Sequence, residues 1–133
     1  MYRRLIRSEK GFTLLELMIV MTIIGILATL AQPSFKQAVL KAKEASLKEN
    51  LFNLRSCLDQ YYADNGAYPD SLGQLVEKGY MRAIPVDPFT SKNDWNTEFY
   101  AGTAGTDEKT GGIYDVHSFS DGVGINGVPY KEW

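Results

Sequence analysis

Glu16 is the residue whose chemistry fits its surroundings least. It is the only charged residue in the run from Phe12 to Phe35, which is otherwise almost wholly apolar. A carboxylate near the centre of a bilayer costs roughly 2.5–3.5 kcal/mol, and such a cost usually indicates a partner cation. Gly11 lies five residues before Glu16, at the edge of a short basic leader. This arrangement predicts that a peptidase cuts after Gly11 and leaves the new amino group of Phe12 close to the carboxylate.

Two interpretations of Glu16 stay open. If helices of other copies of the chain replace lipid around Glu16, the free amine of Phe12 on a neighbouring chain would pair with this carboxylate. Removing one partner of a buried ion pair costs roughly 3–5 kcal/mol, so such a pair would favour one register of assembly. Alternatively, Glu16 is a membrane-interface residue that extends its side chain to the headgroups.

The other reactive side chains do not predict an enzyme. His117 is the only histidine, and a lone histidine on a strand is more often packed or solvent-facing than a metal ligand. No clustering of histidine, cysteine and acidic residues is visible, and neither a nucleophile elbow nor a phosphate-binding loop is present. Cys57 is the single cysteine; it excludes an intrachain disulfide and is expected to pack as a small hydrophobe.

The charges are divided between a basic leader and an acidic remainder. Residues 1–11 carry four basic groups against one acidic group, and the residues after Gly11 carry 10 basic and 15 acidic groups. A basic leader before an apolar run predicts a single membrane pass with the amino terminus in the cytoplasm. The acidic remainder argues against a nucleic-acid-binding function, which would need a basic surface.

A long helix is expected to position these residues. Its apolar first part is long enough to cross a hydrocarbon core of ~30 Å, and Gly25 and Pro33 are expected to kink or loosen it. Its second part is amphipathic, with one apolar stripe that consists of Leu40, Leu47, Leu51, Leu54, Leu58 and Tyr61. Asn65-Gly66 is a stop signal. A helix of about 50 residues, or ~75–80 Å, suits a filament better than a compact domain.

The remaining residues predict a small antiparallel sheet. We expect a short helical or irregular piece at 71–78, strands at 98–101 and 113–119, a hairpin loop at 102–112 and a final edge strand at 128–133. In the second strand, Ile113, Asp115 and His117 are expected on one side and Tyr114 and Val116 on the other. The fold class is therefore α+β, a long N-terminal helix packed on a small sheet. The expected segments are a leader (1–11), a transmembrane helix segment (12–35), an amphipathic continuation (36–64) and a globular domain (65–133).

The residues around the cleavage site resemble the processing site of type IV pilin-like proteins. The match is Lys10-Gly11-Phe12-Thr13-Leu14-Leu15-Glu16, and Pro33 falls where these proteins commonly have a kinking proline. The segments 61–69, 84–89 and 114–122, with Trp133, are similar to the major pseudopilins of type II secretion systems. The resemblance implies a pilin-like fold, cleavage after Gly11 by a prepilin peptidase and methylation of the Phe12 amine.

The function implied by the resemblance is that of a structural subunit of a periplasmic pseudopilus that drives type II protein secretion. The implied partners are other copies of the chain in a helical filament, the prepilin peptidase, an assembly platform with its ATPase, minor pseudopilins and the bacterial inner membrane. One alternative is a type IV pilin for adhesion, motility or DNA uptake, and another is a monomeric, membrane-anchored periplasmic binding domain. Pilins often close their C-terminal region with a disulfide, which the single Cys57 forbids, so we favour the pseudopilin.

Calcium is the one candidate cofactor that the resemblance implies. Major pseudopilins hold this ion in the C-terminal loop, and Asp121 matches the first carboxylate of that loop. Ser118 and Asn126 are further candidate ligands. The segment 122–133 contains no second aspartate, although calcium takes six to eight oxygen ligands. The alternative is that Asp121 and Gly122 simply form a turn.

Overall fold

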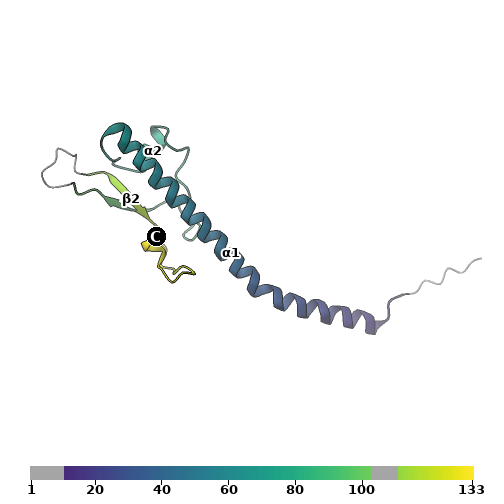
Figure 1. The fold of residues 1–133 in the computed structure, drawn as a ribbon. Helices are drawn as coiled ribbons and strands as arrows, with labels where there is room; N and C mark the ends of the chain where they lie inside the picture. Colours follow the sequence, from purple (N-terminus) through teal and green to yellow (C-terminus); the bar gives the residue numbers. More distant parts are fainter. Residues whose placement is uncertain (1–10, 103–110) are drawn as a thin grey trace, which may run out of the picture. The chain divides into compact units, whose positions relative to one another are not determined.

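The computed structural model describes residues 11–102 and 111–133. Its elements are α1 (Leu14–Asn65), α2 (Gly73–Glu77), β1 (Asn96–Phe99), β2 (Ile113–His117) and the 3-10 helix η1 (Tyr130–Glu132) (Figure 1). The prediction of a long N-terminal helix with a small antiparallel sheet is confirmed. The leader residues 1–10 and most of the expected hairpin loop, 103–110, lie outside the described residues. The chain forms two compact units, which meet between Ala38 and Val39 and are described separately.

The first unit contains the apolar part of α1. Every described residue from Gly11 to Ala38 is exposed. The helix is long and apolar enough to cross a membrane, although an N-terminal signal sequence would also meet these two conditions. The hydroxyls of Thr22 and Thr29 donate to the main-chain carbonyls four residues earlier, at 2.8 Å in both cases. Such internal satisfaction of polar groups is what lipid requires. The α1 assignment includes Pro33, and a kink at Gly25 or Pro33 stays a prediction.

The second unit has its core along the amphipathic part of α1. Leu47, Leu54 and Leu58 are fully buried, as the stripe predicted. They belong to one cluster with residues of α2, the sheet and the C-terminal segment, and Figure 1 shows α2 and β2 beside this part of α1. The helix ends one residue later than expected. Gly66 follows with a φ of 70° and donates its N–H to the carbonyl of Tyr62 at 2.8 Å, so the stop signal acts as a C-cap.

The two strands pair antiparallel with one irregularity. Asn96 is opposite His117 and Glu98 is opposite Asp115, but Phe99 is opposite Ile113, so Tyr114 is an extra residue in β2. The expected strict alternation from 113 onward was therefore wrong, because a bulge shifts all residues beyond it to the other face. As a result Ile113 joins Val116 in the core.

Gly112 allows β2 to begin close to the loop after α1. Its φ is 88°, and a Cβ on this residue would lie 2.5 Å from the carbonyl oxygen of Tyr68. The next residue, Ile113, donates its N–H to the carbonyl of Pro69 at 2.7 Å. Only glycine combines this left-handed conformation with so close an approach.

The C-terminal segment is not the expected edge strand. Among the described residues it makes one isolated bridge, between Val123 and Pro129, and then turns into η1. Pro129 cannot donate to a ladder, and Tyr130 is buried, with its ring 4.1 Å from that of Phe89. Burial of this aromatic ring outweighs strand pairing, so the prediction of a strand at 128–133 was wrong.

Candidate functional site

The N-terminal motif is built around a reciprocal hydrogen-bond pair. Thr13 donates its backbone N–H to Oε2 of Glu16 at 3.1 Å, and Glu16 donates its N–H to the hydroxyl of Thr13 at 3.2 Å. This pair is a capping box, which satisfies two helix donors that otherwise have no partner. Gly11 and Phe12 lie just outside α1 and are exposed. The sequence interpretation missed this role of Glu16, although the spacing Thr-x-x-Glu could have revealed it.

The capping box places the carboxylate of Glu16 at the first turn of α1. A negative charge at this end interacts favourably with the helix dipole. No basic side chain of the described residues forms an ion pair with Glu16.

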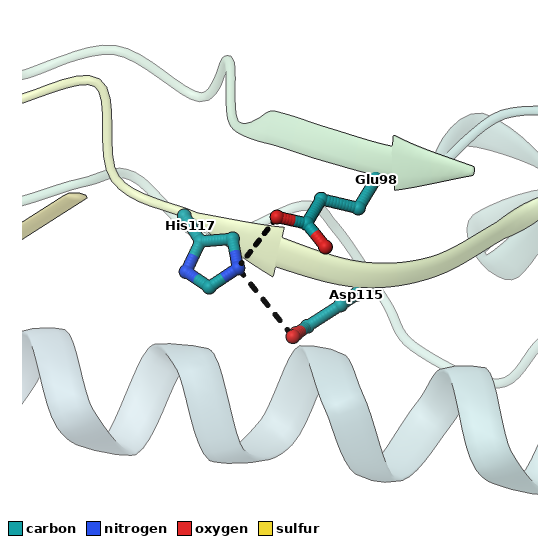
Figure 2. Close-up of side chains that lie close together, drawn as sticks. All are labelled: Glu98, Asp115 and His117. Atoms are coloured by element: carbon teal, nitrogen blue, oxygen red, sulfur yellow. Dashed lines mark ion pairs between the residues drawn. The ribbon is translucent and has the colours of Figure 1, made fainter. Parts of the chain in front are cut away.

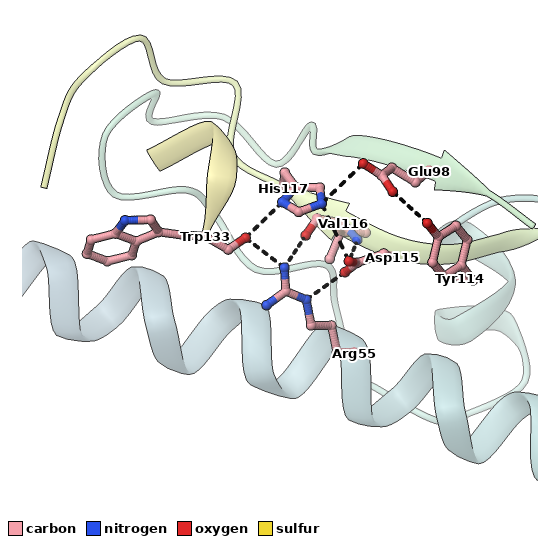
Figure 3. A network of polar contacts seen from close by, with 7 residues as sticks. All are labelled: Arg55, Glu98, Tyr114, Asp115, Val116, His117 and Trp133. Carbon is pink, nitrogen blue, oxygen red and sulfur yellow. Dashed lines mark hydrogen bonds and ion pairs between the residues drawn. The ribbon is translucent and has the colours of Figure 1, made fainter. Parts of the chain in front are cut away.

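Arg55 joins three parts of the second unit. Its Nε donates to Oδ1 of Asp115 at 2.6 Å, and its Nη2 donates to the main-chain carbonyls of Val116 at 3.0 Å and Trp133 at 2.7 Å. Figure 3 shows the guanidinium between α1, β2 and the end of the chain. Its partners are 60 to 78 residues away, so no local pattern could have predicted this network.

His117 does not stand alone. Its Nε2 lies 3.4 Å from Oε1 of Glu98 and 3.4 Å from Oδ2 of Asp115 (Figure 2). The expectation that no histidine and acidic residues cluster was therefore wrong. Strand pairing brings Glu98 opposite Asp115, a long-range relation that the sequence does not display.

Two buried acids hold the C-terminal segment. Oε1 of Glu44 accepts the N–H of Ile125 at 2.8 Å and the hydroxyl of Tyr130 at 2.9 Å. Asp87 is fully buried and accepts the hydroxyl of Ser118 through Oδ2. The C-terminal segment is thus attached to α1 and to the loop before β1 by side chains of the protein itself.

Replacing Glu44 by alanine is expected to destabilise the fold by about 2–3 kcal/mol. The change leaves the N–H of Ile125 and the buried hydroxyl of Tyr130 without their acceptor, and an unsatisfied buried group costs about 1–3 kcal/mol. Urea denaturation of the full chain in detergent would measure the effect. Glu49→Ala, an exposed change on the same helix, is the control, and equal stabilities of the two variants would contradict this role of Glu44.

The stability of the second unit is expected to fall as the pH rises from about 10 to about 12. Burial, followed by the hydrogen bond and charge of Glu44, raises the pKa of Tyr130 from 10.0 to about 12. In this window the unfolded chain loses the tyrosine proton while the folded chain keeps it, so folding becomes less favourable. The contribution is complete below pH 10 and lost above the folded pKa. Urea midpoints of the parent should fall more steeply than those of Tyr130→Phe, and parallel curves would contradict the assignment.

Each of the three candidate calcium ligands has another partner in this structure. The carboxylate of Asp121 is 90% exposed and pairs with the ammonium of Lys131, which holds the pKa of Asp121 below its usual value. The hydroxyl of Ser118 is used by Asp87. Oδ1 of Asn126 accepts the N–H of Val128 at 3.1 Å. These residues do not fit a calcium ion in this arrangement, and calcium binding by the loop stays a prediction.

The fold and the N-terminal motif define a pilin-like protein. A model of the prokaryotic N-terminal methylation motif matches residues 6–31. The chain is 34% identical over 139 residues to the type II secretion system core protein G of Dickeya chrysanthemi, which covers 92% of this chain and 82% of that protein. It is 32% identical over 140 residues to the protein of the same name from Pectobacterium carotovorum, covering 93% and 81%. No solved structure matches the chain.

The chain therefore belongs to the type II secretion system core protein G family, the major pseudopilins. It is a pseudopilin subunit of the type II secretion system, as the resemblance implied. These relatives are structural proteins, which is consistent with the expectation that the chain is not an enzyme. The apolar N-terminal helix and the family together fit a protein anchored in the inner membrane.

Proposed function

We propose that the chain is cut after Gly11 by a prepilin peptidase and methylated on the new Phe12 amine. The observation that carries this proposal is the position of Gly11 and Phe12, exposed and immediately before the capping box of an apolar helix. The match of the methylation-motif model to residues 6–31 supports it. Cleavage removes the basic leader 1–11 and retains the membrane segment 12–35.

The mature subunit crosses the inner membrane once, and its C-terminal domain lies in the periplasm. The basic leader supports this orientation, because positive charges stay on the cytoplasmic side. The amphipathic continuation, 36–64, carries the domain formed by 65–133. We expect the inner-membrane platform, its ATPase and minor pseudopilins to act on this subunit as it leaves the membrane.

Mature copies assemble into a periplasmic pseudopilus, in which Glu16 pairs with the Phe12 amine of a neighbour. A methylated amine keeps its positive charge, so methylation preserves the pair. The absence of a cation partner for Glu16 within the described residues supports an intermolecular one. The energetic reason is that an unpaired carboxylate in an apolar environment is costly.

Intact-mass measurement of the membrane-extracted protein tests the processing step. Cells that contain the prepilin peptidase should yield a chain that lacks residues 1–11 and carries one added methyl group. Cells without the peptidase should yield the unprocessed chain, and Gly11→Val should remain unprocessed in both. A chain that still begins at Met1 in the presence of an active peptidase would contradict the proposal.

A further inference from the structure

Three side chains from the two strands direct one ligand atom each to a common point. Glu98 lies on β1 opposite Asp115 of β2, and His117 follows two residues later on the same face of β2. One ligand atom from each of Glu98, Asp115 and His117 lies within 4.8 Å of the ligand atoms of the other two (Figure 2). The side chains are 47%, 27% and 15% exposed, so the point is reachable from solvent but partly shielded.

The remaining polar atom of each side chain is held by a different neighbour (Figure 3). Nδ1 of His117 lies 2.8 Å from the main-chain carbonyl of Trp133, Oδ1 of Asp115 accepts from Arg55 at 2.6 Å, and Oε2 of Glu98 accepts from the hydroxyl of Tyr114 at 2.7 Å. Metal-binding histidines usually donate their second ring N–H to such an acceptor. Donation from Nδ1 leaves the lone pair of a neutral imidazole on Nε2, the atom that faces the two carboxylates.

We propose that Glu98, Asp115 and His117 bind a divalent transition-metal ion, and that this ion is zinc. Zinc lies about 2.0–2.1 Å from histidine nitrogen and about 2.0–2.2 Å from carboxylate oxygen, so two ligands of a tetrahedral site are about 3.4 Å apart. Nε2 of His117 is 3.4 Å from both carboxylate oxygens, which is longer than an ordinary hydrogen bond. The spacing therefore fits an ion between the ligands, with water in the fourth position.

The types of ligand distinguish zinc from calcium. Imidazole suits zinc, whereas calcium takes six to eight oxygen ligands. With a neutral His117, the two carboxylates and the guanidinium of Arg55 leave one negative charge at the site, which attracts a dication. The site belongs to the second unit, whereas the proposed function uses the N-terminal motif of the first unit. A bound ion would join β1 to β2, and one of its ligands, Asp115, is the residue that Arg55 connects to α1.

Zinc titration of the full-length chain tests the site. The protein, purified in detergent and stripped of metal with a chelator, is titrated with zinc chloride by calorimetry and with cobalt by visible absorption. We expect one ion per chain, a cobalt spectrum typical of low coordination number and a higher melting temperature with zinc. Glu98→Gln should weaken binding more than about 100-fold. Tyr114→Phe, which removes only an outer contact, should weaken binding by about 10–100-fold.

Two control variants test whether zinc binds at side chains other than Glu98, Asp115 and His117. Glu77→Gln, an exposed change on α2, and Cys57→Ser should bind zinc as the parent does. Glu98 is half-exposed on β1, so its replacement should leave the circular dichroism spectrum unchanged. The proposal is overturned if the parent shows no saturable zinc binding. That result would mean that His117 only forms ion pairs with Glu98 and Asp115. It is also overturned if Glu98→Gln binds like the parent or if Cys57→Ser abolishes binding.

Discussion

A chain with Glu16→Gln is expected to be processed after Gly11 and inserted into the membrane, yet to form few or no filaments. Glutamine at this position can still accept the N–H of Thr13, so it preserves the capping box. It removes only the charge that would pair with the Phe12 amine of a neighbour. The loss of one partner from a buried pair costs about 3–5 kcal/mol per contact, enough to suppress assembly.

Thr13→Ala is the matched control for this experiment. It removes the hydroxyl that accepts the N–H of Glu16 but keeps the carboxylate, and the loss of an N-cap costs about 1 kcal/mol. Filaments are counted by electron microscopy in cells that express the peptidase and assembly platform. If Glu16→Gln assembles normally while Thr13→Ala does not, Glu16 acts as a helix cap and the pairing hypothesis is wrong.

Leu54→Ala is expected to destabilise the second unit by about 2–5 kcal/mol, the range for a large-to-small change in a packed core. Leu54 has no exposed surface and belongs to the cluster that joins α1 to α2, the sheet and Tyr130. Truncation removes apolar contacts and leaves a cavity whose walls relax only partly. Because a domain is typically stable by 5–15 kcal/mol, this loss is a large share of the total.

Urea denaturation of the full chain in detergent measures the effect of Leu54→Ala. Phe52→Ala is the control, because Phe52 lies on the same helix and is 71% exposed. Its replacement should change the free energy of unfolding by less than about 0.5 kcal/mol. Similar midpoints for the two variants would show that Leu54 does not anchor the core.

The predictions that succeeded depend on neighbours in the chain. The leucine stripe predicted the buried face of α1, and Asn65-Gly66 predicted its end. Cys57 packs beside the core and donates to the carbonyl of Tyr80 at 3.4 Å, and burial raises the pKa of its thiol. The helical period of 3.6 residues puts such positions on one face, so a linear pattern contains this information.

The predictions that failed depend on partners far along the chain. The bulge at Tyr114 exists because β2 must place both Ile113 and Val116 in the core opposite β1. The segment 128–133 does not form a strand, because burial of Tyr130 against Phe89 and Glu44 is more favourable than strand pairing. In both cases the local preference of the residues for regular strand structure is outweighed by tertiary packing.

Local chemistry in the chain was therefore enough to indicate the long apolar helix, the lone carboxylate five residues after Gly11 and, through these, the pilin-like class. Tertiary structure alone decided that Arg55 binds the end of the chain and that Glu98, Asp115 and His117 meet. The physical reason is range: helix periodicity and capping act over a few residues, whereas strand pairing and buried polar contacts join residues that only folding brings together.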